Sequence, residues 1–196
     1  MIQKWFNIIS DHRISLRDRM FRIVTGTCMV ALVFILPMGR NPWNILILAV
    51  SLLAMAAIVK YSVRKECIHT GATAITVLLL TLFPISFFTA GGFYSGVPEW
   101  FVFCFIYVCL TLQGKRMAVF FALCTAETLL CYGLALYFPE HIIQSTQQRS
   151  FFDSAFSVVL VGLLTCVLLL FLTRMYEEEN ALSQQQKKEI EELNRA

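Results

Sequence analysis

Residues 154–173 read SAFSVVLVGLLTCVLLLFLT, a run of twenty positions without a charged side chain. A helix that crosses the roughly 30 Å of hydrocarbon in a bilayer needs about 20 apolar residues, because its backbone polar groups must be satisfied within the segment. The next residues, 174–196, read RMYEEENALSQQQKKEIEELNRA, in which charged and amide side chains dominate. The run therefore predicts a transmembrane helix that meets water at Arg174.

The whole chain is strongly apolar. Of its 196 residues, 58% are hydrophobic and only 15% are charged, and the mean hydropathy is +0.68. Soluble domains usually contain about 45–50% apolar and about 25% charged residues. The composition excludes a soluble globule, a disordered chain and a secreted disulfide scaffold. It predicts an all-α membrane protein.

Charged residues divide the chain into long stretches that carry few or no charges. There are six: Ile23–Gly39, Asn41–Val59, Thr70–Pro98, Trp100–Gly114, Met117–Pro139 and Ser154–Thr173. Five are long enough to span a bilayer. The fourth, Trp100–Gly114, extends only about 22 Å at 1.5 Å per residue and needs local thinning of the bilayer. We therefore expect a polytopic protein with six transmembrane helices over residues 20–173.

Lysine and arginine are distributed unevenly over the segments between these stretches. Along the chain, the seven segments hold five, one, three, none, two, one and four of these residues. Alternate segments therefore carry 14 against 2, and the positive-inside rule places both termini in the cytoplasm. We expect a multi-pass protein of the cell membrane with cytoplasmic N- and C-termini.

Residues 1–19 form a basic leader. Apolar residues recur in it at nearly helical spacing: Ile2, Trp5, Ile9 and Leu16. This spacing favours an amphipathic helix that lies along the inner membrane interface. An unstructured leader is the alternative. A cleaved signal peptide is not expected, because no small-residue cleavage site follows the apolar run.

No pattern in the chain indicates covalent chemistry. Six of the seven cysteines lie inside the apolar stretches, where Cys behaves as a small hydrophobic residue. The histidines cannot share a metal or haem, since His12 and His69 fall on the predicted inner side and His141 on the outer side. No phosphate-binding loop or catalytic triad is present. We expect no catalytic residue, no metal and no cofactor in these residues, and no nucleic-acid partner.

The sequence after the sixth stretch predicts a helix that leaves the membrane. From Ser154 to Ala196 the chain contains one glycine and no proline, so one helix of roughly 64 Å can form at 1.5 Å per residue. Residues 174–196 then make a cytoplasmic signalling helix. Its seam consists of Leu182, Gln186, Ile190 and Leu193. We expect this seam to pair two copies weakly as a homodimer; a solvated charged tail is the alternative.

Three segments resemble a known family. QQQKKEIEELNRA at residues 184–196 resembles the signalling helix of bacterial sensor histidine kinases. Residues 87–116, FFTAGGFYSGVPEWFVFCFIYVCLTLQGKR, and residues 127–142, ETLLCYGLALYFPEHI, are similar to the multi-span input regions of such kinases in Gram-positive anaerobes. Together the three segments comprise 59 of the 184 residues from 13 to 196.

The resemblance implies the sensory input region of a two-component system. A kinase core with ATP and Mg, and a response regulator as partner, would follow Ala196, where the helical pattern has no glycine cap or proline stop. No catalytic residue can be transferred, since the kinase box is absent from the 196 residues. The alternatives are the input region of a diguanylate cyclase and a self-standing small membrane transporter or scaffold.

Glu127 lies near the middle of the fifth stretch, where a carboxylate is costly. Cys124 and Cys131 share its predicted helix face. In one interpretation Glu127 locks two helices through a hydrogen bond. The expected partners are the hydroxyls of Thr81, Tyr107, Thr111 and Thr165. In the other interpretation these residues sense protonation or a ligand.

The predicted outer surface offers a second candidate site. Its members are Phe93, Tyr94 and Trp100 around a glycine-rich turn, with Asp153 and Ser157 one helical turn apart on the sixth helix. We interpret them as a shallow pocket for an apolar or amphipathic signal; interfacial aromatic anchors are the alternative. Binding there would shift a two-state equilibrium, and the sixth helix would rotate or slide to pass the change onward.

Overall fold

The computed structural model describes residues 16–38, 42–143 and 146–195, and every regular element in these ranges is helical. The long helices are α2 (Leu16–Ile35), α3 (Pro42–Arg64), α4 (Ile68–Ala90), α5 (Val97–Thr111), α6 (Gly114–Tyr137) and α7 (Gln147–Arg195). Short 3₁₀ turns lie in three connections: η1 (Leu36–Met38), η2 (Gly92–Tyr94) and η3 (Pro139–His141). The predicted all-α fold is confirmed for the described residues.

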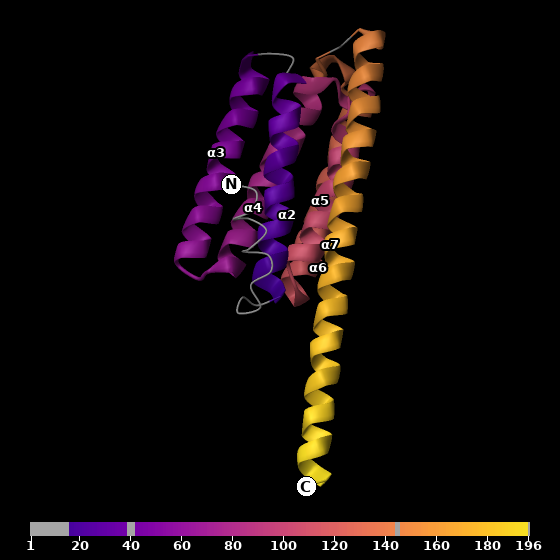
Figure 1. Ribbon diagram of the computed structural model, residues 1–196. Coiled ribbons are helices and arrows are strands. Elements are labelled where there is room, and N and C mark those ends of the chain that lie inside the picture. The colour runs from indigo at the N-terminus through magenta and orange to yellow at the C-terminus, as the bar shows by residue number, and fades with distance from the viewer. Residues whose placement is uncertain (1–15, 39–41, 144–145, 196) are drawn as a thin grey trace.

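Consecutive helices run in alternate directions and form a bundle, from which the C-terminal part of α7 projects far beyond the others (Figure 1). Four of the described helices are long and apolar enough to cross a membrane: α3, α4, α6 and the segment Ser150–Glu192 of α7. Helix α5 is apolar but has only 15 residues, and α2 carries Arg19 and Arg22 near its start. The chain thus has the long apolar helices of a membrane protein.

Helix α5 is the centre of the bundle. It contacts α2, α4, α6 and α7, and more than half of its residues are buried, including Trp100, Phe103 and Tyr107. Its apolar residues surround the whole helix, as in a helix that lies largely within protein, and Val102 and Cys109 mark the face that is exposed. Helices longer than α5 pack around it in the structure. The expected thinning of the bilayer at this helix stays a prediction.

The element boundaries differ from the predicted ones at both ends of the chain. Helix α2 begins at Leu16, so the last residues of the predicted leader 1–19 belong to the bundle. The amphipathic pattern over residues 1–15 lies outside the described residues. Helix α7 begins at Gln147 and continues without a break through residues 174–195.

Helices α3 and α4 approach each other closely beside the turn that joins them. Gly71, in the first turn of α4, faces the buried Ser62 of α3. A Cβ at position 71 would collide with the Ser62 side chain. Glycine therefore permits this contact.

We expect Gly71→Ala to destabilise the bundle by about 1–3 kcal/mol, the usual cost of overpacking a core. Gly133→Ala in α6 is the matched control, because nothing lies within 4 Å of a Cβ built there. This control should be neutral or slightly stabilised, since alanine favours helix more than glycine does. Thermal unfolding of the purified chain in detergent measures both. Equal stabilities would contradict the close contact with Ser62.

Candidate functional site

A cavity of about 80 Å³ lies at the end of the bundle where the α2–α3, α4–α5 and α6–α7 connections are found. One buried water needs roughly 10–15 Å³, so the cavity has room for a small molecule. Its walls come from α2, α3, α4, α5 and α7. The lining residues are Cys28, Ala31, Leu32, Ile35, Asn44, Leu48, Leu79, Leu82, Phe83, Ser86, Ala90, Gly96, Val97, Trp100, Phe103, Asp153 and Ser157.

Hydrogen bonds join α7 to the start of α5 beside this cavity. The backbone N–H of Gly96 donates to Asp153 Oδ2 at 3.1 Å. One turn further along both helices, Trp100 Nε1–H donates to Ser157 Oγ at 3.3 Å. Trp100 and Ser157 are buried, so water does not compete for their bond. These contacts hold α7 against α5 at the cavity wall.

The Asp153 carboxylate acts as an anion at the N-terminus of α5. The first N–H groups of a helix lack partners within the helix, and this end carries partial positive charge. Asp153 binds the N–H of the N-cap residue, Gly96. A Cβ at Gly96 would collide with the Ser157 side chain and come within 2.7 Å of the Asp153 backbone oxygen. A further bond, from Ser154 Oγ–H to Glu99 Oε1 at 3.2 Å, joins the same two helices.

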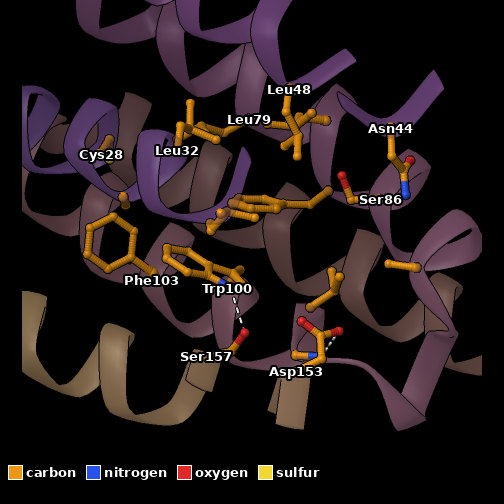
Figure 2. Close-up of a pocket in the computed structure, with 17 residues that line it drawn as sticks. Cys28, Leu32, Asn44, Leu48, Leu79, Ser86, Trp100, Phe103, Asp153 and Ser157 are labelled. Carbon is orange, nitrogen blue, oxygen red and sulfur yellow. Dashed lines mark hydrogen bonds between the residues drawn. The ribbon is translucent and has the colours of Figure 1, made fainter. Parts of the chain in front are cut away.

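Polar side chains of α3 and α4 also line the cavity. Asn44, near the start of α3, is buried, and its Oδ1 accepts a hydrogen bond from Thr89 Oγ1 at 2.7 Å. Ser86 precedes Thr89 by about one turn of α4. Asn44, Ser86 and Asp153 lie on the same side of the cavity (Figure 2).

The structure brings together three of the five residues predicted for an outer pocket: Trp100, Asp153 and Ser157 all line the cavity. Sequence reasoning missed the walls contributed by α2, α3 and α4, because one chain's pattern does not show which faces of neighbouring helices meet. Asn44 offered a signal, as an amide just inside an apolar stretch.

The other two predicted pocket residues lie elsewhere. The ring of Phe93 packs edge-on against Phe87 and Tyr132, at centroid distances of 5.7 and 4.8 Å. These contacts place Phe93 in an aromatic cluster that joins η2, α4 and α6. Tyr94, the next residue, is 78% exposed. Neither side chain lines the cavity.

Glu127 lies on α6 beside buried cysteines. Cys124 and Cys131 are both buried, and Cys124 Sγ is 3.7 Å from Cys104 Sγ of α5. The Oε1 atom of Glu127 is buried and has no hydrogen-bond partner among the described residues. Glu127 thus lies on α6 between two buried cysteines, as predicted, and one of them, Cys124, contacts α5.

Three of the four hydroxyls expected to bind Glu127 are engaged elsewhere. The Tyr107 hydroxyl shares a hydrogen bond with Thr25 Oγ1 of α2 at 3.2 Å. Thr111 Oγ1 donates to the Tyr107 backbone oxygen at 2.8 Å. Thr81 Oγ1 donates to carbonyl oxygens of its own helix. These three side chains do not lock helices together through Glu127.

Helix α7 leaves the bundle beside an ion pair with α2. Arg19 Nη2 donates to Glu178 Oε2 at 2.9 Å, and the two side chains are 7% and 50% exposed. Met175, one turn earlier, is buried. Every described side chain of α7 beyond Glu178 is exposed.

The predicted pairing seam lies on this projecting part of α7. Gln186 and Ile190 are exposed. Leu182 and Leu193 also lie on α7, but the structure does not describe their side chains.

No family model, curated protein or solved structure matches this chain. Among the described residues, no group of three or more His, Cys, Asp or Glu side chains is placed to hold a metal ion. The geometry itself defines the candidate site: a mostly apolar cavity with four polar side chains, connected by hydrogen bonds to α7.

We expect Asp153→Ala to lower the free energy of unfolding by about 1–2 kcal/mol, because it removes the acceptor for the Gly96 N–H at the start of α5. Asp153→Asn keeps an acceptor and should lose less. Glu140→Ala, an exposed acidic residue of η3 at the same end of the bundle, should change stability by less than about 0.5 kcal/mol. Thermal unfolding followed by circular dichroism measures all three. Equal losses for Asp153→Ala and Glu140→Ala would exclude the capping role.

Proposed function

We propose that the chain is the membrane-embedded sensory input region of a two-component sensor histidine kinase, which relays a small-molecule, lipid or membrane signal to a kinase core. One observation carries this proposal: helix α7 runs uninterrupted from the cavity wall, at Asp153 and Ser157, to Arg195 outside the bundle. A change at the cavity thus has a continuous route to the projecting segment. The resemblance of residues 184–196 to the signalling helix of such kinases supports the same function.

The proposed topology has six membrane-crossing helices and two cytoplasmic termini. Helices α3, α4, α6 and α7 have the length and apolarity to cross, and α2 and α5 complete the alternation beside them. Basic residues support the orientation. Arg64 lies in the last turn of α3 and Lys115 and Arg116 in the first turn of α6, at the end of the bundle where α2 begins. The positive-inside rule places this end in the cytoplasm.

The proposed transmission uses two attachments of α7. Near the cavity, Asp153 and Ser157 bind the start of α5; where α7 leaves the bundle, Glu178 binds Arg19 of α2. A stimulus that favours one packing of the cavity walls shifts the population between two arrangements of these contacts. A rotation or a short slide of α7 then reaches the projecting segment.

The output side of the proposal involves a second copy of the chain. The projecting segments pair weakly through the seam of Leu182, Gln186, Ile190 and Leu193, and the homodimer presents two kinase cores to each other. Those cores hold ATP and Mg and pass phosphate to a response regulator. The connections between helices are short, which favours stimuli that are small, lipidic or a property of the bilayer.

Insertions after Glu179 test the proposal in a fusion of residues 1–196 to the core of a characterised histidine kinase. One inserted residue turns the following helix by about 100° and two by about 200°, whereas seven return it to within about 20°. We expect one or two residues to abolish or invert regulation and seven to restore it. Autophosphorylation in membrane vesicles is the measurement. Regulation that is indifferent to the insertions would contradict transmission through α7.

The Arg19–Glu178 ion pair should set the basal output of the same fusion. Glu178→Gln leaves the buried guanidinium unpaired, and we expect a several-fold change in autophosphorylation. Glu177→Gln, one residue earlier on α7, is the matched control and should have little effect. Combining Arg19→Glu with Glu178→Arg should recover part of the change, with a coupling energy of about 1 kcal/mol. Additive effects of the two substitutions would show that the pair does not act in transmission.

A further inference from the structure

The cavity is polar on one side and apolar on the other. Figure 2 shows Asn44, Ser86 and Asp153 on one side and Cys28 and Phe103 on the other. The helix order agrees with this view, because the polar residues lie nearer the interhelical connections and the two apolar ones lie deeper in the bundle. Ligand pockets are mostly apolar with a few placed polar groups that orient the ligand. This lining therefore fits a molecule with one polar head and a hydrocarbon part.

Hydrogen-bonding capacity remains on the polar side. Asn44 Oδ1 already accepts a hydrogen bond from Thr89 Oγ1. The amide N–H groups of Asn44 bond to none of the described residues. Ser157 Oγ accepts the Trp100 N–H and keeps its own O–H as a donor. The cavity thus offers donors from α3 and α7 to an oxygen atom of a ligand.

The charge of the lining disfavours ionic ligands. None of the described lining residues is Lys, Arg or His, and Asp153 is the acidic residue among them. A carboxylate or phosphate head would lose its hydration, meet no cation and face the Asp153 carboxylate. That carboxylate is already engaged by the N–H of Gly96, which makes it a poor sole partner for a cationic head. An uncharged head fits best.

We infer that the cavity binds a small uncharged amphiphile, a short hydrocarbon chain or ring with one hydroxyl or carbonyl group. Its oxygen atom binds the Asn44 amide on the polar side, and its hydrocarbon part packs against the apolar lining, beginning with Leu48. Binding itself needs no output domain. Its consequence rests on the proposed function, because the ligand would occupy the cavity that Trp100, Asp153 and Ser157 line, and these residues hold α7 to α5.

A brominated hexanol tests the site by quenching Trp100 fluorescence. The chain has three tryptophans, so Trp5→Phe with Trp43→Phe leaves Trp100, which lines the cavity, as the reporter. In the full chain in nanodiscs, we expect quenching that saturates with concentration. If the probe only partitioned into lipid, quenching would increase with concentration without saturating, and that result would overturn the inference.

The head group is tested with ligands of the same chain length. Brominated hexanoate at neutral pH should bind at least about tenfold more weakly than the alcohol, because its carboxylate meets no cation and faces Asp153. Brominated hexane, which lacks the hydroxyl, should also bind more weakly. Equal binding of the carboxylate and the alcohol would overturn the assigned ligand class.

Leu48 and Leu53 on α3 give a matched pair of variants in the Trp100 background. Leu48 lines the cavity and is 9% exposed, whereas Leu53 is 70% exposed. Leu48→Phe should fill the cavity and abolish saturable quenching, and Leu53→Phe should retain it. If Leu48→Phe fails to fold, Asn44→Leu replaces it and should remove the preference for the alcohol over the alkane. Unchanged binding in the folded cavity variants would overturn the site.

The kinase fusion separates this inference from the proposed function. Unbrominated hexanol should change autophosphorylation over the same concentration range in which its brominated analogue binds. Saturable binding without a change in autophosphorylation would support the site and contradict the sensory role. Without saturable binding the site is overturned, while a periodic response to insertions after Glu179 would still support the function.

Discussion

The enclosure of α5 by longer helices is the constraint on which the rest of the structure depends. Its 15 residues are too few to satisfy the width of a bilayer's hydrocarbon alone, and bulky side chains surround it on all sides. Most of these side chains are buried or half-buried because α2, α4, α6 and α7 pack around the helix, while Val102 and Cys109 are exposed. The enclosure also brings the start of α5 against α7 and the Tyr107 hydroxyl against Thr25 of α2. The cavity and the position of α7 both follow from this arrangement.

The two flanks of α5 are filled differently. Toward α4 and α6, aromatic rings pack closely around Phe87, which contacts Phe93, Phe101 and Tyr132 at centroid distances of 5.6–6.0 Å. Toward α2, α3 and α7 the cavity remains, and another face of α4 contributes to its wall. Protein interiors are generally packed as densely as organic crystals, and the cavity is a place where these helices leave space between their side chains. One of the helices that line it, α7, projects from the bundle.

Much of the fold could be predicted because the cost of placing charge in hydrocarbon acts locally along the sequence. The uncharged run at residues 154–173 lies within α7, and each of the other long apolar stretches contains most of one helix but extends beyond it. Contacts between helices could not be predicted in this way. Phe93 and Tyr94 are neighbours with similar side chains, yet in a 3₁₀ turn one ring packs against an aromatic cluster while the other is 78% exposed. Asn44 joins the cavity because α3 and α4 meet there, which no local pattern reveals.

The ion pair between Arg19 and Glu178 attaches α7 to α2 at the point where α7 leaves the bundle, so a rigid α7 could pivot about this point. Measured along the helix at 1.5 Å per residue, the arm from Glu178 back to Asp153 is about 37 Å and the arm onward to Arg195 is about 25 Å. With Glu178 as the fulcrum, a sideways push of about 1 Å at Asp153 swings the far tip by about 0.7 Å in the opposite direction. A displacement smaller than an atom would therefore reach the tip reduced by about a third and with its direction reversed.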